Sequence, residues 1–71
     1  MLGWNDRISY YIDMASNNKL DMNARWRALI KAGDLTNVGV TPKQINQIKF
    51  FSSDKDWYMR NASLIALAKI N

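Results

Sequence analysis

The sequence predicts an all-α protein in which four helices pair as two antiparallel αα-hairpins. Two observations favour this fold. Apolar side chains recur at helical spacing in four segments, and residues that cap helices well stand at the segment starts. The two halves of the chain also match at an offset of 35 residues, so that Asp21 and Leu29 are repeated as Asp56 and Leu64. Such a period is typical of helical-hairpin repeats.

The composition suits a single small domain over residues 1–71, because 48% hydrophobic residues exclude a disordered chain. The net charge of +4 is a mild basic excess. There is no Cys, which favours an intracellular, cytoplasmic setting. The longest apolar run, Leu64–Ala68, is too short to cross a bilayer, so no membrane partner is expected.

The first hairpin is expected at residues 5–16 and 21–32. Ile8, Ile12 and Ala15 lie on one apolar stripe of the first helix, and Ser16 begins the polar run that ends it. Asp21 is the expected N-cap of the second helix. Gly33 is expected to end that helix in a left-handed conformation.

A polar line formed by Asn23, Arg27 and Lys31 runs along the second helix, opposite its apolar stripe. Such a line is most often a solvated face, and this is the preferred interpretation. The sharper alternative is a basic surface, with Arg27 and Lys31 contacting phosphate groups.

The second hairpin is expected at residues 42–51 and 56–70. Thr41, Pro42 and Gln44 form a complete capping box with proline in the first turn, and Asp56 is the N-cap of the last helix. That last helix is apolar on two sides. One side carries Met59, Ala62, Ser63, Ala66 and Ile70, and the nearly opposite side carries Trp57, Leu64 and Ala68.

A helix with two apolar sides needs neighbours on both, so the stripe of Trp57, Leu64 and Ala68 is either buried on the first two helices or free for a partner. Trp4 and Trp26 are assigned to the core. The other side chains expected to be mostly buried are Ile8, Tyr11, Ile12, Leu29, Ile30, Ile45, Ile48, Phe51, Ala62, Ile65 and Ala66.

Both second helices of the hairpins resemble the second helix of a HEAT repeat, in which a turn Asp is followed by a helix Arg and spaced Ala and Leu residues. The residues that carry this resemblance are Asp54, Asp56, Met59, Arg60, Ala66, Leu67 and Ile70, and less closely Asp21, Ala24, Arg25, Ala28, Gly33 and Leu35. The resemblance implies a stack of helical hairpins without chemistry of its own that binds partners along its faces. It also implies a ladder in which Arg25 or Arg60 reaches Asp56 or Asp21 of the other hairpin.

Enzymatic activity is not expected. The chain has no His and no Cys, every acidic residue is Asp, and no glycine-rich phosphate loop is present. The usual proton shuttle, thiol nucleophile and transition-metal ligands are therefore missing. We expect no catalytic residue, no metal site and no cofactor.

The preferred functional hypothesis is a small protein-binding module, an adaptor or inhibitor, that acts through the last helix. Its partner would be another protein or a second copy of the chain. The Asn-, Ile- and Lys-rich usage would suit an AT-rich genome, and a stand-alone domain this short would suit a phage or mobile element. The candidate contact residues are Trp57, Tyr58, Arg60, Asn61, Leu64 and Ala68.

The alternative is a small basic protein that binds nucleic acid. Residues 41–70 can be interpreted as a helix–turn–helix, with Trp57, Tyr58, Arg60 and Asn61 opening the second helix, where base-contacting residues usually lie.

Overall fold

The computed structural model describes residues 4–70, which form four α-helices and no strand. They are α1 (Trp4–Ser16), α2 (Met22–Leu35), α3 (Pro42–Phe50) and α4 (Trp57–Ala68). A 3₁₀ turn follows α2 (η1, Thr36–Val38), and another follows α3 (η2, Phe51–Ser53). The all-α prediction is confirmed.

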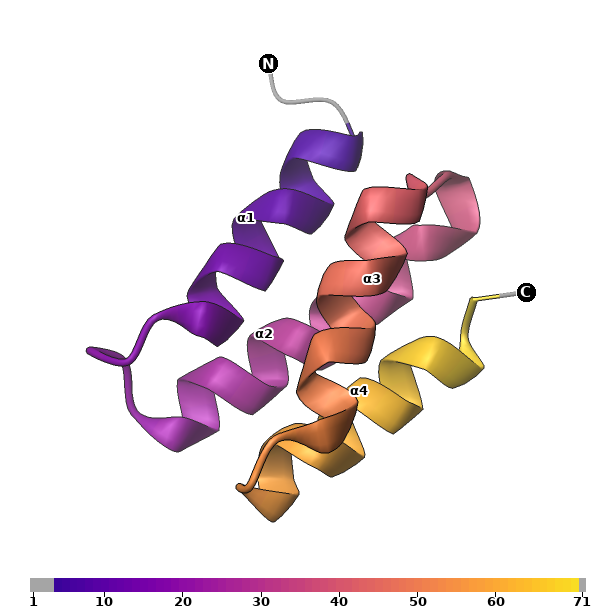
Figure 1. Ribbon diagram of the computed structural model, residues 1–71. Helices are drawn as coiled ribbons and strands as arrows, with labels where there is room; N and C mark the ends of the chain where they lie inside the picture. The colour runs from indigo at the N-terminus through magenta and orange to yellow at the C-terminus, as the bar shows by residue number, and fades with distance from the viewer. Residues whose placement is uncertain (1–3, 71) are drawn as a thin grey trace.

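The helices pair in chain order, α1 with α2 and α3 with α4, as two antiparallel hairpins (Figure 1). The hairpins lie beside each other, so that α1 and α3 form one layer and α2 and α4 form the other. The packing is uneven. The helix α2 packs extensively on both α1 and α4, whereas α3 makes smaller contacts with α1 and α4.

The predicted starts of α2, α3 and α4 are confirmed. The Asp21 carboxylate accepts a hydrogen bond from the Ala24 N–H, and the Asp56 carboxylate accepts one from the Tyr58 N–H. At α3 the capping box is complete, because Thr41 Oγ1 accepts from the Gln44 N–H while Gln44 Oε1 accepts from the Thr41 N–H. These bonds satisfy donors that a free helix end leaves unpaired.

The predicted end of α2 is wrong. The helix continues through Gly33 to Leu35, and of the two glycines within residues 4–70 it is Gly39 that has a positive φ, at 129°. Gly33 serves a different need, since a Cβ there would lie 2.6 Å from the Ala66 Cα. The glycine therefore allows α2 and α4 to cross at close range.

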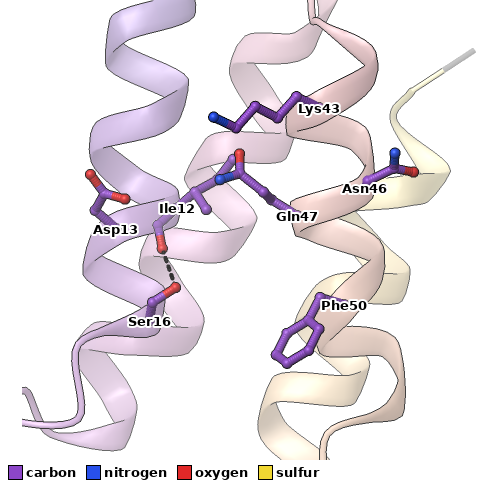
Figure 2. A pocket seen from close by; sticks show the side chains of 7 residues that line it. All are labelled: Ile12, Asp13, Ser16, Lys43, Asn46, Gln47 and Phe50. Atoms are coloured by element: carbon purple, nitrogen blue, oxygen red, sulfur yellow. Dashed lines mark hydrogen bonds between the residues drawn. The ribbon is translucent and has the colours of Figure 1, made fainter.

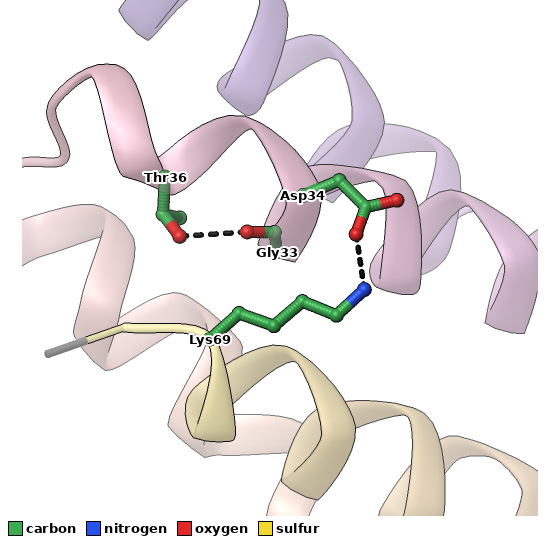
Figure 3. Close-up of polar contacts among 4 residues, drawn as sticks. All are labelled: Gly33, Asp34, Thr36 and Lys69. Atoms are coloured by element: carbon green, nitrogen blue, oxygen red, sulfur yellow. Dashed lines mark hydrogen bonds and ion pairs between the residues drawn. The ribbon is translucent and has the colours of Figure 1, made fainter.

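The polar contacts around this crossing appear in Figure 3. The Thr36 hydroxyl donates to the Gly33 carbonyl at 2.6 Å, and Lys69 forms an ion pair with Asp34. Both contacts lie where the last turn of α2 meets the end of α4.

The core lies between the two layers. Its buried apolar residues are Ile8, Ile12, Ala15, Ala28, Leu29, Ala32, Ile48, Phe51, Met59, Ala62 and Ala66. Four residues predicted to be mostly buried are only half-buried: Tyr11, Trp26, Ile30 and Ile45. The side chain of Trp4 lies outside the described residues.

Ile65 was predicted to be buried, and this is wrong, because its side chain is 45% exposed. The side of α4 that faces the core carries Met59, Ala62, Ser63 and Ala66. Small side chains there let α2 approach closely, and a bulky Ile in that position would hold the helices apart. The buried Ser63 hydroxyl donates to the Ile48 carbonyl at 2.6 Å and joins α4 to α3.

Candidate protein-binding face

The outward side of α4 is exposed in the structure. Trp57 is 57% exposed, Tyr58 51% and Leu64 55%, and Asn61 and Ala68 are also exposed. The stripe of Trp57, Leu64 and Ala68 is therefore not buried on the first two helices. Large apolar side chains gathered on one helix face are unusual on a protein surface and typically mark a contact site.

The reason for this exposure emerges when residues 35 apart, here called equivalent positions, are compared. Trp26, Ile30 and Gly33 of α2 face α4, and helical spacing puts Met22 and Leu29 on the same side of α2. The equivalent positions in α4 are Trp57, Asn61, Leu64, Ile65 and Ala68. Leu29 is completely buried and its equivalent Leu64 is 55% exposed. Within residues 4–70, no helix covers α4 as α4 covers α2.

A groove of about 200 Å³ runs between α2 and α4 beside this exposed face. Its walls are almost wholly apolar, and they are formed by Trp26, Ile30, Trp57, Tyr58, Asn61, Ala62 and Ile65. The Trp26 and Tyr58 rings stack at 6.3 Å between centroids, and the Trp57 and Tyr58 rings lie 4.6 Å apart. The three aromatic rings thus form one connected surface across the two helices.

Trp26, Ile30 and Ile65 were absent from the predicted contact residues because each was assigned to the core. For the two residues on α2, their position relative to the polar line could have indicated this. Trp26 and Ile30 lie at the edge of the apolar stripe of α2, next to the polar line that includes Arg27. Residues at such an edge are half-buried and remain accessible to a partner.

The basic residues Arg27 and Lys31 are exposed on a ridge of α2, where they line another groove of about 200 Å³ against α1; neither lines the α2–α4 groove. The Arg27 guanidinium lies 5.5 Å from the centre of the Trp26 ring. Neither basic residue is paired with a carboxylate of the described chain. Through Trp26, the structure brings Arg27 close to the groove beside the α4 contact face, whereas Lys31 lies on the side of α2 that faces α1.

Arg60 differs from the other predicted contact residues, because it is half-buried and its side chain is hydrogen-bonded to the segment that precedes α4. Its guanidinium donates to the carbonyls of Asp54 (2.9 Å) and Lys55 (3.1 Å). Arg25, at the equivalent position, donates to the Ala15 carbonyl at 2.9 Å. The predicted ladder to Asp21 or Asp56 is therefore wrong, since backbone carbonyls within each hairpin take the place of the carboxylates.

Another groove, of about 590 Å³, lies between α1 and α3 and is open to solvent. Figure 2 shows Lys43 and Gln47 extending from α3 toward α1, with Phe50 farther along α3. Asp13, Asn46 and Ser16 complete the lining around Ile12, whose accessible surface is more apolar than polar. Phe50 is 74% exposed and was not singled out in the sequence, and its ring lies 5.8 Å from that of the buried Phe51.

Neither a cluster of metal-binding side chains nor a membrane-spanning helix is found among the described residues. No three His, Cys, Asp or Glu side chains of this part of the chain come together as a metal site. Likewise, none of its helices combines the length and apolar character needed to cross a membrane.

Comparison with known proteins found no matching family model and no significantly similar curated protein or solved structure.

Proposed function

We propose that the protein is a small non-enzymatic binding module, an adaptor or inhibitor, that contacts another protein through the outward face of α4. The observation that carries this proposal is the contrast between Leu29 and Leu64. The two leucines stand at equivalent positions, and one is completely buried while the other is 55% exposed. A surface built like a helix–helix interface is left open to solvent.

The residue types on this face support protein recognition. Trp and Tyr are the residues most often found at the energetic centres of protein interfaces, because each removes a large apolar area from water while ordering few torsions. Trp57 and Tyr58 stand at the start of α4, and Leu64 and Ala68 extend the face along the helix. The outermost positions of this face carry no charge, which lowers the desolvation penalty of binding.

The resemblance to HEAT repeats stays a prediction. Two side-chain contacts are in keeping with a repeat, because they join equivalent positions: Gln44 Nε2 donates to Ser9 Oγ at 3.0 Å, and Lys69 pairs with Asp34. The missing Arg–Asp ladder departs from the family pattern.

Nucleic-acid recognition is less well supported. The guanidinium of Arg60, the best candidate for contacting a base edge, already donates to two carbonyls. Asp54 and Asp56 stand at the start of α4, where a phosphate group would have to approach.

Photo-crosslinking in the cells that make the protein tests this proposal. A benzophenone side chain placed at Ala68 should give discrete adducts with a partner protein, and the same group at the exposed position Asn46 of α3 should not. Adding Leu64→Asp should abolish the adducts while the circular dichroism spectrum is retained. Equal adducts from both positions, or adducts that ignore Leu64→Asp, would contradict the proposal.

A further inference from the structure

The groove between α2 and α4 also indicates what kind of partner it accepts. We propose that the occupant is an amphipathic α-helix of another protein, with aliphatic or aromatic anchors in the groove and carboxylates beside Arg27 and Lys31. This inference rests on the proposed function, because it assumes that this side of the molecule binds protein.

The walls of the groove favour a helical occupant. Both walls are helices whose backbone groups are already paired within the helix, so the groove offers no backbone donor or acceptor to an extended peptide. A segment entering an apolar groove must then satisfy its own backbone hydrogen bonds, and an α-helix does so. The Trp26, Tyr58 and Trp57 rings give this helix a continuous apolar floor.

The basic side chain nearest the groove favours an acidic occupant, because the Arg27 guanidinium lies 5.5 Å from the centre of the Trp26 ring, which forms part of the groove wall. Arg27 and Lys31 are four residues apart on α2, both are exposed, and neither has a carboxylate partner in residues 4–70. The nearby acidic side chain Asp34 is already paired with Lys69. Carboxylates along one edge of the incoming helix would meet this ridge, and complementary rim charges mainly set partner choice and association rate.

A second copy of the chain fits this chemistry poorly. Each copy carries a net charge of +4 and the same basic ridge. Asp21 and Asp56 are committed to capping α2 and α4, so they are not free to meet that ridge. Asp13 on α1 is exposed, but docking two copies through this ridge would bring chains of the same net charge together, so a different protein is the better source of carboxylates.

Two stapled helical peptides test the proposal directly. Both carry leucines at i, i+3, i+4 and i+7, and they differ only in having Glu or Lys at the positions flanking this stripe. The intact protein should bind the Glu peptide about tenfold more tightly than the Lys peptide, with the preference shrinking as salt is added. Trp fluorescence and calorimetry report the two affinities.

Charge reversal tests whether the preference for the Glu peptide depends on Arg27 and Lys31. The double variant Arg27→Glu/Lys31→Glu should lose the preference for the Glu peptide and favour the Lys peptide. The matched control is Lys43→Glu/Lys49→Glu, which changes the net charge equally with two exposed residues of α3. This control should retain most of the original preference, because its charges are distant from the groove.

The remaining outcomes separate the partner chemistry from the proposed function. If Leu64→Asp abolishes the cellular adducts while the peptides bind without charge preference, the protein-binding face stands and the acidic helix is wrong. If both charge-reversal variants lose the preference for the Glu peptide equally, the preference depends on net charge alone. That result would overturn the proposal that Arg27 and Lys31 contact the carboxylates of the partner. Tighter, ridge-dependent binding of an oligothymidine, or a dimer by sedimentation that excludes both peptides, would also overturn the proposal.

Discussion

The two hairpins use the same pattern of residues in different surroundings. In the first hairpin, α2 is covered on one side by α1 and on another by α4. In the second, α4 is covered by α2 and less extensively by α3, and its outward side is exposed. Equivalent residues therefore have different roles: Leu29 belongs to the core, and Leu64 belongs to the candidate contact face. An apolar residue on a helix can pack against another helix, but its spacing in the sequence does not show whether such a helix is present. In the first hairpin α4 covers this side of α2, and in the second the corresponding side of α4 is exposed.

The largest expected difference between the hairpins is at this leucine pair. Leu29→Ala should reduce the free energy of unfolding by about 2–5 kcal/mol, because it leaves a cavity in a packed core. Leu64→Ala should change the free energy of unfolding by less than about 0.5 kcal/mol, as is usual for an exposed position. Urea unfolding of both variants measures the contrast, and similar losses would mean that α4 is covered in solution.

The next effect concerns the close crossing of α2 and α4. Gly33→Ala should destabilise the fold by about 1–3 kcal/mol, because the added methyl group meets the Ala66 backbone and the helices must separate. The equivalent residue Ala68 is exposed, so even Ala68→Leu should leave the thermal midpoint nearly unchanged. A stable Gly33→Ala variant would show that α2 and α4 are farther apart in solution.

At the arginine pair we expect similarity between the hairpins. Arg25→Met and Arg60→Met each remove hydrogen bonds to backbone carbonyls and should reduce stability by about 0.5–1.5 kcal/mol. Arg27→Met, on the exposed ridge of α2, is the control with little expected change. If only one of the two variants loses stability, the arginines do not have the same structural role.

The smallest effect is expected for the ion pair that joins the hairpins. The side chains of Lys69 and Asp34 are 39% and 52% exposed, so their coupling should be about 0–1 kcal/mol. A double-mutant cycle with Asp34→Asn and Lys69→Met measures this energy, which should fall further in high salt. A larger coupling that salt does not weaken would place the pair in a more enclosed setting.

Local chemistry made the helix starts predictable. Asp21, Thr41 with Gln44, and Asp56 each satisfy free N–H groups through contacts within three residues, and such contacts can be inferred from neighbouring letters. The fold class followed because these three starts preceded apolar residues at helical spacing, and Ile8, Ile12 and Ala15 showed the same spacing in a fourth segment.

The end of α2 and the inward side of α4 depend on contacts between distant residues, and the sequence pattern could not resolve them. Glycine is a common residue at helix ends, but Gly33 is needed here because a Cβ at this position would collide with Ala66 of α4. Both sides of α4 carry apolar residues at helical spacing, so the spacing alone did not show which side faces the core. The core took the side with Ala62 and Ser63 because α2 lies too close for Ile65.

The uneven packing of α4 links the order of folding to binding. The contacts between α1 and α2 are local in sequence, whereas the main support of α4 is α2, far earlier in the chain. Local contacts form at a lower entropic cost, so we expect the first hairpin to form early and α4 to dock late. The groove has walls from both α2 and α4 and exists only once that docking is complete. A partner that bridges those walls would hold α4 in place, and saturation with it would slow amide exchange in the second hairpin.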